Sequence, residues 1–172
     1  MRKPPQQNQK ERQINIYSLN TARTNAVVHH SLQIAATHPH KFDIVLHQEP
    51  WWGNISARDN AMGEARAAGW NVLLPVTNPQ GEPCRPRVLT YFRQGTDLEI
   101  VQCTDIIQNY NIQILDIKRP GTLQQTIQLI NIYNAPEGSE HFAADSLTTL
   151  QLDHNIPTII TGVGGNIRPA AH

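Results

Sequence analysis

The chain has 172 residues, with 14 basic and 14 acidic side chains and a formal net charge of +0. This length fits one domain, and the charge balance excludes a protein that holds nucleic acid mainly through bulk positive charge. No apolar run approaches the length of a membrane span. The cysteines, Cys84 and Cys103, have no spacing typical of a metal site or disulfide framework. We therefore expect an intracellular protein.

The N-terminal part predicts a leader followed by alternating strands and helices. Residues 1–13 are basic and lack an apolar stretch, so we expect a disordered leader rather than a secretory signal, with the domain at 14–172. Ile14–Leu19 alternates apolar and polar side chains, as strands do. Thr24–Thr37 has a helical apolar stripe and precedes Pro39, which cannot continue a helix. Phe42–Leu46 is a short apolar run, which predicts a buried strand.

The next segment predicts a second helix and then a strand. Ser56 can cap this helix, and Gly69 follows its expected end. Alanines share one face of it: Ala61, Ala65 and Ala68. Asn71–Val76 is strand-like, whereas Thr77–Pro86 contains Gly and several Pro residues and predicts a loop.

The remaining chain predicts mainly strands. Four segments are rich in β-forming residues: Arg87–Arg93, Leu98–Thr104, Ile112–Ile117 and Thr126–Tyr133. A helix is expected over Phe142–Leu152 and a buried strand over Pro157–Thr161. A helix between the first two strands favours a parallel pair, and the later run of strands favours antiparallel hairpins. This order predicts an α/β (α+β) fold, for which a mixed sheet with helices on one face is sufficient.

Polar residues close three of the predicted strands or lie just beyond them. They are Asn20, Glu49 and the pair Tyr133 and Asn134. The crevice beyond the carboxyl ends of strands is a common ligand site in such sheets. Oxygen ligands gathered there suit Mg²⁺, so these residues are candidates for holding a metal and a phosphate.

Each candidate has an alternative interpretation. Asn20 can cap the following helix, Glu49 can be an exposed strand end, and Tyr133 can be a core residue with its hydroxyl at the rim. His47 is expected to share a face with Glu49 by strand alternation. It is then either a neighbour of the metal site or a packed strand histidine.

Several motifs in order resemble the endonuclease/exonuclease/phosphatase superfamily, especially the endonuclease domain of fungal non-LTR retrotransposons. They are Leu19-Asn20, Asp43-Ile-Val-Leu-His-Gln-Glu49-Pro-Trp-Trp52, Arg85-Pro-Arg-Val-Leu-Thr-Tyr91 and Leu129-Ile-Asn-Ile-Tyr-Asn-Ala-Pro136. The resemblance covers roughly Ile14 to Asn166. It implies a DNase I-like fold of two packed β-sheets flanked by helices in four αββα layers.

The resemblance also implies a reaction, Mg²⁺-dependent hydrolysis of DNA phosphodiesters, with Mn²⁺ as an alternative metal. By position, Glu49 would bind the metal and Asn20 would support that site. Tyr133 and Asn134 would contact the scissile phosphate, and Arg87 would bind substrate. DNA is then the expected partner, and a nuclear location follows from it.

The sequence departs from this class after the strand at Pro157–Thr161. The class has Gly-Asp-x-Asn there, but this chain reads Gly162-Val-Gly-Gly-Asn166. Asn166 matches the Asn if one residue is inserted, and no carboxylate matches the Asp. The class also ends on an Asp-His pair that this sequence lacks. We expect a truncated domain with an incomplete second half, impaired hydrolysis and self-association through exposed sheet edges.

The sequence also allows other functions. One alternative is a non-catalytic nucleic-acid-binding remnant, and another is a truncated element copy without a selected activity. Basic residues in or near loops could meet a nucleic-acid backbone or simply be solvated: Arg85, Arg87, Arg93, Lys118 and Arg119.

Overall fold

The computed structural model describes residues 13–54, 62–75, 85–120, 126–136, 138–139 and 143–164. The predicted leader, apart from Gln13, lies outside the described residues. So do most of the predicted loop Thr77–Pro86 and the candidate Asn166.

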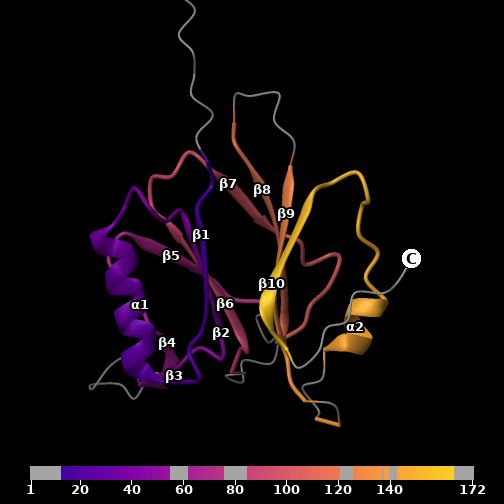
Figure 1. Ribbon diagram of the computed structural model, residues 1–172, viewed down its shortest axis with the longest axis horizontal. Coiled ribbons are helices and arrows are strands. Elements are labelled where there is room, and N and C mark those ends of the chain that lie inside the picture. Colours follow the sequence, from indigo (N-terminus) through magenta and orange to yellow (C-terminus); the bar gives the residue numbers. More distant parts are fainter. Residues whose placement is uncertain are drawn as a thin grey trace, which may run out of the picture.

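The described strands form two four-stranded sheets and one two-stranded ribbon (Figure 1). The first sheet has the strand order β1 (Ile16–Asn20), β2 (Ile44–Gln48), β6 (Val88–Arg93), β5 (Trp70–Leu73). The second has the order β10 (Thr158–Gly164), β9 (Ile127–Asn134), β8 (Ile112–Lys118), β7 (Glu99–Gln102). The ribbon pairs β3 (Trp52–Asn54) with β4 (Met62–Glu64), and the helices are α1 (Asn25–Thr37) and α2 (Ala144–Thr148).

The two sheets face each other, and one helix lies on the outer side of each (Figure 1). Val28 and Leu32 of α1 pack against the outer face of the first sheet. Ile44 of β2 packs against Leu129 of β9, and this apolar cluster joins the sheets. Beyond the second sheet, Leu147 of α2 packs on its outer cluster. Alternation of side chains gives the central strands of both sheets two buried faces. The buried strand predicted over Pro157–Thr161 is instead an exposed edge strand, β10, because it has a neighbour on one side only.

The sequence correctly predicted a sheet-rich α+β fold with both kinds of strand pairing. The strands β1 and β2 are parallel, while β7, β8 and β9 are joined by antiparallel pairing. The simpler prediction of one mixed sheet with helices on one face is wrong, because these strands belong to separate sheets. The reason is that β8 and β9 are apolar on both faces, and the inner face is buried against β2.

Two helix predictions need correction. The segment expected to form a helix after Ser56 contains the strand β4, which pairs with β3, and an irregular stretch at residues 65–67. Cross-strand pairing outweighs the alanine spacing here. The carbonyl of Ala65 accepts a hydrogen bond from the buried Tyr91 hydroxyl at 2.9 Å. The helix expected over Phe142–Leu152 is the shorter α2.

The interior between the sheets becomes polar toward the carboxyl end of β2. Asn131 of β9 accepts a hydrogen bond from Gln48 Nε2 at 2.6 Å, and its own Nδ2 donates to the carbonyl of Leu89 at 3.1 Å. Thr90 donates to Gln113 Oε1 at 2.6 Å. These buried amides satisfy one another, as buried polar groups must. Gln48 directly precedes Glu49, so the network ties the two sheets together next to that residue.

Candidate functional site

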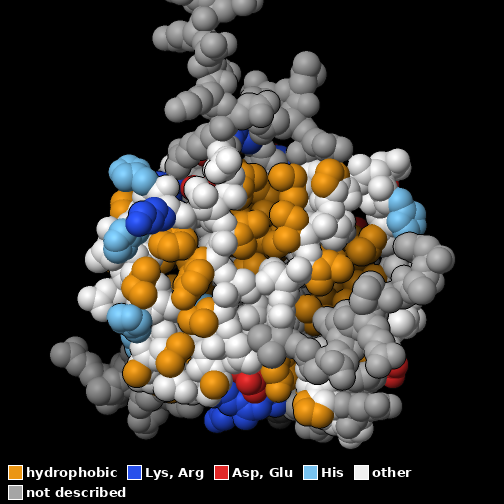
Figure 2. Space-filling view, in the orientation of Figure 1, with side chains coloured by type: hydrophobic (Ala, Val, Ile, Leu, Met, Phe, Trp, Pro, Cys, Tyr) orange, Lys and Arg blue, Asp and Glu red, His pale blue; other side chains and the backbone are white. Residues whose placement is uncertain are grey.

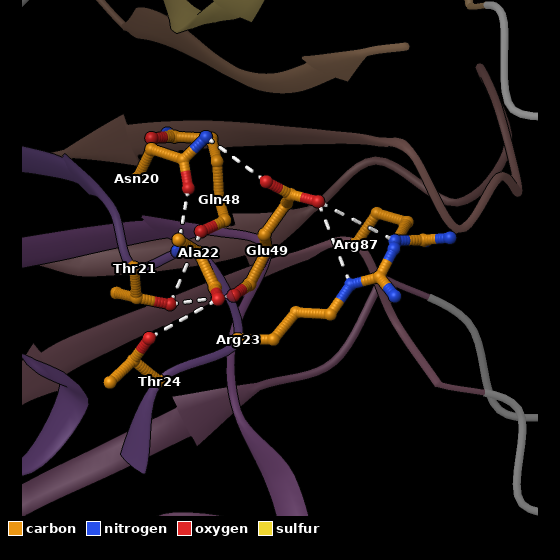
Figure 3. Close-up of polar contacts among 8 residues, drawn as sticks. All are labelled: Asn20, Thr21, Ala22, Arg23, Thr24, Gln48, Glu49 and Arg87. Atoms are coloured by element: carbon orange, nitrogen blue, oxygen red, sulfur yellow. Dashed lines mark hydrogen bonds and ion pairs between the residues drawn. The ribbon is translucent and has the colours of Figure 1, made fainter. Parts of the chain in front are cut away.

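Three strand ends meet at one side of the molecule. The strands β1 and β2 run parallel and in register, so Asn20 pairs with Gln48 and lies beside Glu49. Tyr133 lies near the end of β9 in the other sheet, and its hydroxyl interacts with the Glu49 carboxylate. The structure therefore brings together three sequence-predicted residues from three strands. Figure 3 shows Asn20 and Glu49 pointing toward each other.

The backbone at this site is unusual. Among the described residues, three non-glycine residues have positive φ: Ala22 at 48°, Arg23 at 57° and Glu49 at 47°. Such conformations cost free energy in residues with a Cβ and are often found at functional sites. All three belong to this one site. This grouping indicates that the loop after β1 and the end of β2 are held in a specific shape.

Hydrogen bonds lock this shape (Figure 3). The carbonyl of Glu49 accepts from the Thr21 hydroxyl at 2.6 Å and from the Arg23 backbone N–H at 2.7 Å. The N–H of Glu49 donates to the carbonyl of Arg87 at 2.8 Å. Both backbone polar groups of Glu49 are thus engaged, and its side chain leaves the strand in a fixed direction.

Asn20 supports the Glu49 carboxylate. Its Nδ2 donates to Glu49 Oε2 at 3.3 Å, and its Oδ1 accepts from the Ala22 N–H at 2.7 Å. The N-cap of α1 is Thr24, without a side-chain cap hydrogen bond. Asn20 is therefore part of the site rather than the helix cap that its residue type also allowed.

Two arginines flank the same carboxylate. Arg23 Nε and Arg87 Nη1 each lie 3.6 Å from Glu49 Oε1. The guanidinium carbon of Arg87 also lies 5.6 Å from the centre of the Tyr133 ring, a cation–π arrangement. Burial first, and next the nearby Glu49 carboxylate, raise the pKa of Tyr133. The phenol hydroxyl can donate a hydrogen bond.

Glu49 and the two arginines border a cavity of about 440 Å³. Its described lining includes three arginines, one carboxylate and aromatic rings: Arg23, Arg85, Arg87, Glu49, Trp51 and Trp52. Guanidinium groups bind phosphate oxygens bidentately, and aromatic faces stack on bases. The cavity thus offers groups that suit a nucleotide phosphate beside an apolar wall.

The donor set does not by itself fit a resident Mg²⁺. Glu49 Oε1 faces two guanidinium groups, and Oε2 accepts from the Asn20 amide. Mg²⁺ prefers several oxygen ligands, usually including carboxylates. Within the described residues, no group of three or more His, Cys, Asp or Glu side chains could hold a metal ion. The Mg²⁺ site stays a prediction.

Other candidates lie elsewhere. His47 does not share the Glu49 side of the strand, because the left-handed backbone of Glu49 ends the alternation. Its ring is buried under α1, with Nε2 2.8 Å from the Ser31 hydroxyl. Asn134 is buried, and its Oδ1 accepts from the Ala143 N–H at 2.9 Å. A substrate contact for Asn134 therefore has no geometric support, although it stays a prediction.

The basic residues separate into two groups. Arg93 pairs with Asp43 at 3.1 Å and Arg119 pairs with Asp97 at 3.2 Å, away from the cavity. Arg85 and Arg87 line the cavity. Sequence reasoning missed Arg23, which joins them. Its position three residues after Asn20, in the connection between β1 and α1, was the available signal.

Comparisons with known proteins add no identification. No protein-family model matches the chain, and no curated protein matches it. No helix in the described part of the chain is long and apolar enough to cross a membrane.

Proposed function

We propose that this chain binds the phosphodiester backbone of DNA at the Glu49 site, as a DNase I-like domain related to retrotransposon endonucleases. One observation carries the proposal. Three strand ends from two sheets place Asn20, Glu49 and Tyr133 together, beside a cavity lined by arginines. The layer order and the sequence motifs support the same relationship. A DNA partner would place the protein in the nucleus.

Within this proposal, each group has a role that its chemistry allows. Arg87 would pair with a non-bridging phosphate oxygen, and the protonated Tyr133 hydroxyl would donate a hydrogen bond to the same group. Asn20 would hold the Glu49 carboxylate in place. In the class that the sequence resembles, Mg²⁺ supplies Lewis-acid stabilisation of the reacting phosphate when bound.

Hydrolysis, the ancestral reaction of that class, should be lost or strongly reduced. The Asp of the Gly-Asp-x-Asn motif is replaced by Val163, whose backbone pairs in register with Tyr133. A carboxylate is therefore missing at the position next to the proposed phosphate contact. His47 is buried against Ser31 and cannot replace the general base. Loss of one acid or base commonly lowers the rate by about 10²–10⁴.

DNA binding and cleavage can be measured separately. Fluorescence anisotropy with a short labelled duplex in EDTA should show binding that weakens as salt rises, with a log–log slope of about −0.9 for each phosphate contacted. Plasmid nicking in Mg²⁺ or Mn²⁺ should be very slow and equal in wild type and Glu49→Ala. Absence of binding at low salt would refute the proposal. Nicking that Glu49→Ala abolishes would instead establish an active nuclease.

A second copy of the chain is the other partner that we propose. The strands β1 and β10 are each at the end of their sheet, and neither contains a charged residue. Thr161 of β10 donates a hydrogen bond to Ser18 of β1 at 2.6 Å, so the two edges form one face. Hydrophobic side chains gather over this face (Figure 2). Ile159 is 45% exposed and Ile160 is 59% exposed.

A second copy suits this face because its own β1 and β10 edges are separated by the same distance as the two edges that they would meet. A twofold axis normal to the sheets would pair each edge antiparallel with its own symmetry mate, which closes the assembly. Unprotected edges without charges favour such pairing. In the monomer, Ile159 pairs in register with Leu129 and Ile160 with Ile130. Pairing would therefore extend both apolar clusters.

Light scattering after gel filtration tests this association. Wild type should form a concentration-dependent dimer, and Ile160→Lys should be a monomer because a charge would enter the paired face. The matched control is Val101→Lys, since Val101 is also exposed but lies on β7 at the far edge of the second sheet. A wild-type monomer at every concentration would contradict the proposal.

A further inference from the structure

The Glu49 carboxylate lies between two guanidinium groups and does not satisfy all of their hydrogen-bond donors. Both ion-pair distances to Oε1 are 3.6 Å, which is beyond hydrogen-bond range. Arg87 Nη1 is buried and has no hydrogen-bond partner in the described part of the chain. An unpaired buried donor is costly. A better acceptor at this position would therefore gain hydrogen bonds that Glu49 does not make.

The charges around the cavity favour an anion over a cation. Among the described residues that line the cavity, Arg23 and Arg87 contribute two positive charges against the carboxylate of Glu49, and Arg85 adds a third. A divalent cation bound to Glu49, the one carboxylate in the described lining, would meet two guanidinium groups within ion-pair distance of that carboxylate. A phosphate would meet the opposite sign of charge.

We infer that Arg23 and Arg87 form a phosphate clamp, and that Glu49 is its internal occupant in the free protein. A phosphate of the nucleic acid would displace the carboxylate from both guanidinium groups. Glu49 would keep its contact with Asn20 Nδ2. This inference rests on the proposed function for the identity of its ligand, but it assigns Glu49 a different role, that of an intramolecular competitor.

The backbone of both arginines is held in place by hydrogen bonds, and the Arg87 side chain is largely buried. The Arg23 N–H binds the Glu49 carbonyl at 2.7 Å, and the Arg87 N–H binds the carbonyl of Tyr110 at 2.8 Å. The Tyr133 ring lies against the Arg87 guanidinium and orients it. Figure 3 shows both arginine side chains converging on the Glu49 carboxylate from separate segments. A ligand therefore has little cost of ordering Arg87, and it must order Arg23 and move one carboxylate.

The test is whether one substitution, Glu49→Gln, strengthens DNA binding. Glu49→Gln keeps the shape and the Asn20 contact but removes the competing charge. In EDTA, we expect it to bind a short DNA duplex several-fold more tightly than wild type. Arg23→Ala should weaken binding by about tenfold, as expected for loss of one charge-assisted hydrogen bond, and reduce the salt slope by about 1.

Two controls make the result specific. Arg66 is exposed and pairs with Glu64, away from this cavity. Arg66→Ala removes the same charge as Arg23→Ala, and it should leave the affinity for DNA within about twofold of wild type. Equal melting temperatures of wild type and Glu49→Gln exclude a folding effect. If Glu49→Gln binds DNA no more tightly than wild type, the clamp is wrong.

Inorganic pyrophosphate separates this inference from the proposed function. Calorimetric titration of pyrophosphate, without DNA or metal, reads the clamp directly. The clamp is supported, even if duplex DNA does not bind, when Glu49→Gln binds pyrophosphate more tightly than wild type. This gain should be lost again in Glu49→Gln/Arg23→Ala. Equal or undetectable pyrophosphate binding by all of these proteins overturns it.

Discussion

Lowering the pH from 7 to 4 should reduce the free energy of unfolding by about 3 kcal/mol through His47 alone. Burial lowers the pKa of His47 from 6.5 to about 4. Above pH 6.5 the side chain is neutral in both folded and unfolded states, so it carries no penalty. As the pH falls below 6.5, the unfolded state binds a proton that the folded state excludes. The loss of stability becomes complete near pH 4.

The variant His47→Phe isolates this contribution. Its ring can keep the edge-to-face contact with Tyr91, whose ring centre lies 5.2 Å away, but it cannot bind a proton. Urea unfolding at several pH values should give the variant a weaker pH dependence than wild type over the range from pH 6.5 to 4. Parallel pH dependences of the two proteins would show that His47 is not the responsible group.

Asn131→Leu should lower the free energy of unfolding by about 3 kcal/mol at neutral pH, because buried amide partners lose their hydrogen bonds. Gln48 Nε2 would lose its 2.6 Å acceptor. The carbonyls of His47 and Leu89 would lose the Asn131 donor at 3.4 Å and 3.1 Å. A leucine of similar volume keeps the space filled, so the effect reports on polar pairing rather than on a cavity. Urea unfolding measures it.

A double variant distinguishes pairing from general damage. Gln48→Leu/Asn131→Leu removes both partners of the buried hydrogen bond between the two side-chain amides. The double variant should therefore lose clearly less free energy of unfolding than the sum of the losses in the two single variants. Gln94→Leu is the control, because its hydrogen bond to Asn71 is exposed and should contribute little. Simple additivity of the two core substitutions would contradict the account of this network.

The sequence predicts elements well where side-chain period and turn residues agree. The helix expected over Thr24–Thr37 is α1, and the strand expected over Ile112–Ile117 is β8 with one more residue. The helix expected after Ser56 fails because alanines at helical spacing carry little information about tertiary pairing. The partner of Gly63 is Gly53, and the pairing of two segments is not encoded in the side-chain period of either one.

Candidate site residues were found from strand ends, but their environment was not. Asn20, Glu49 and Tyr133 meet because the parallel register of β1 and β2 and the facing sheets bring them together. Their immediate neighbours depend on backbone conformations that residue type does not predict. The left-handed conformations of Arg23 and Glu49 bring the Arg23 side chain to the Glu49 carboxylate. They also turn Glu49 away from the sheet face that His47 occupies.

Chemical-shift mapping tests most directly whether DNA phosphates bind at the Glu49 site. A titration of ¹⁵N-labelled protein with a short duplex in EDTA should shift the amides of Thr21–Thr24, Glu49, Arg85, Arg87 and Tyr133. Amides of β7, at the far edge of the second sheet, should stay unchanged. Shifts centred away from the Glu49 site, or no shifts at low salt, would contradict the claim.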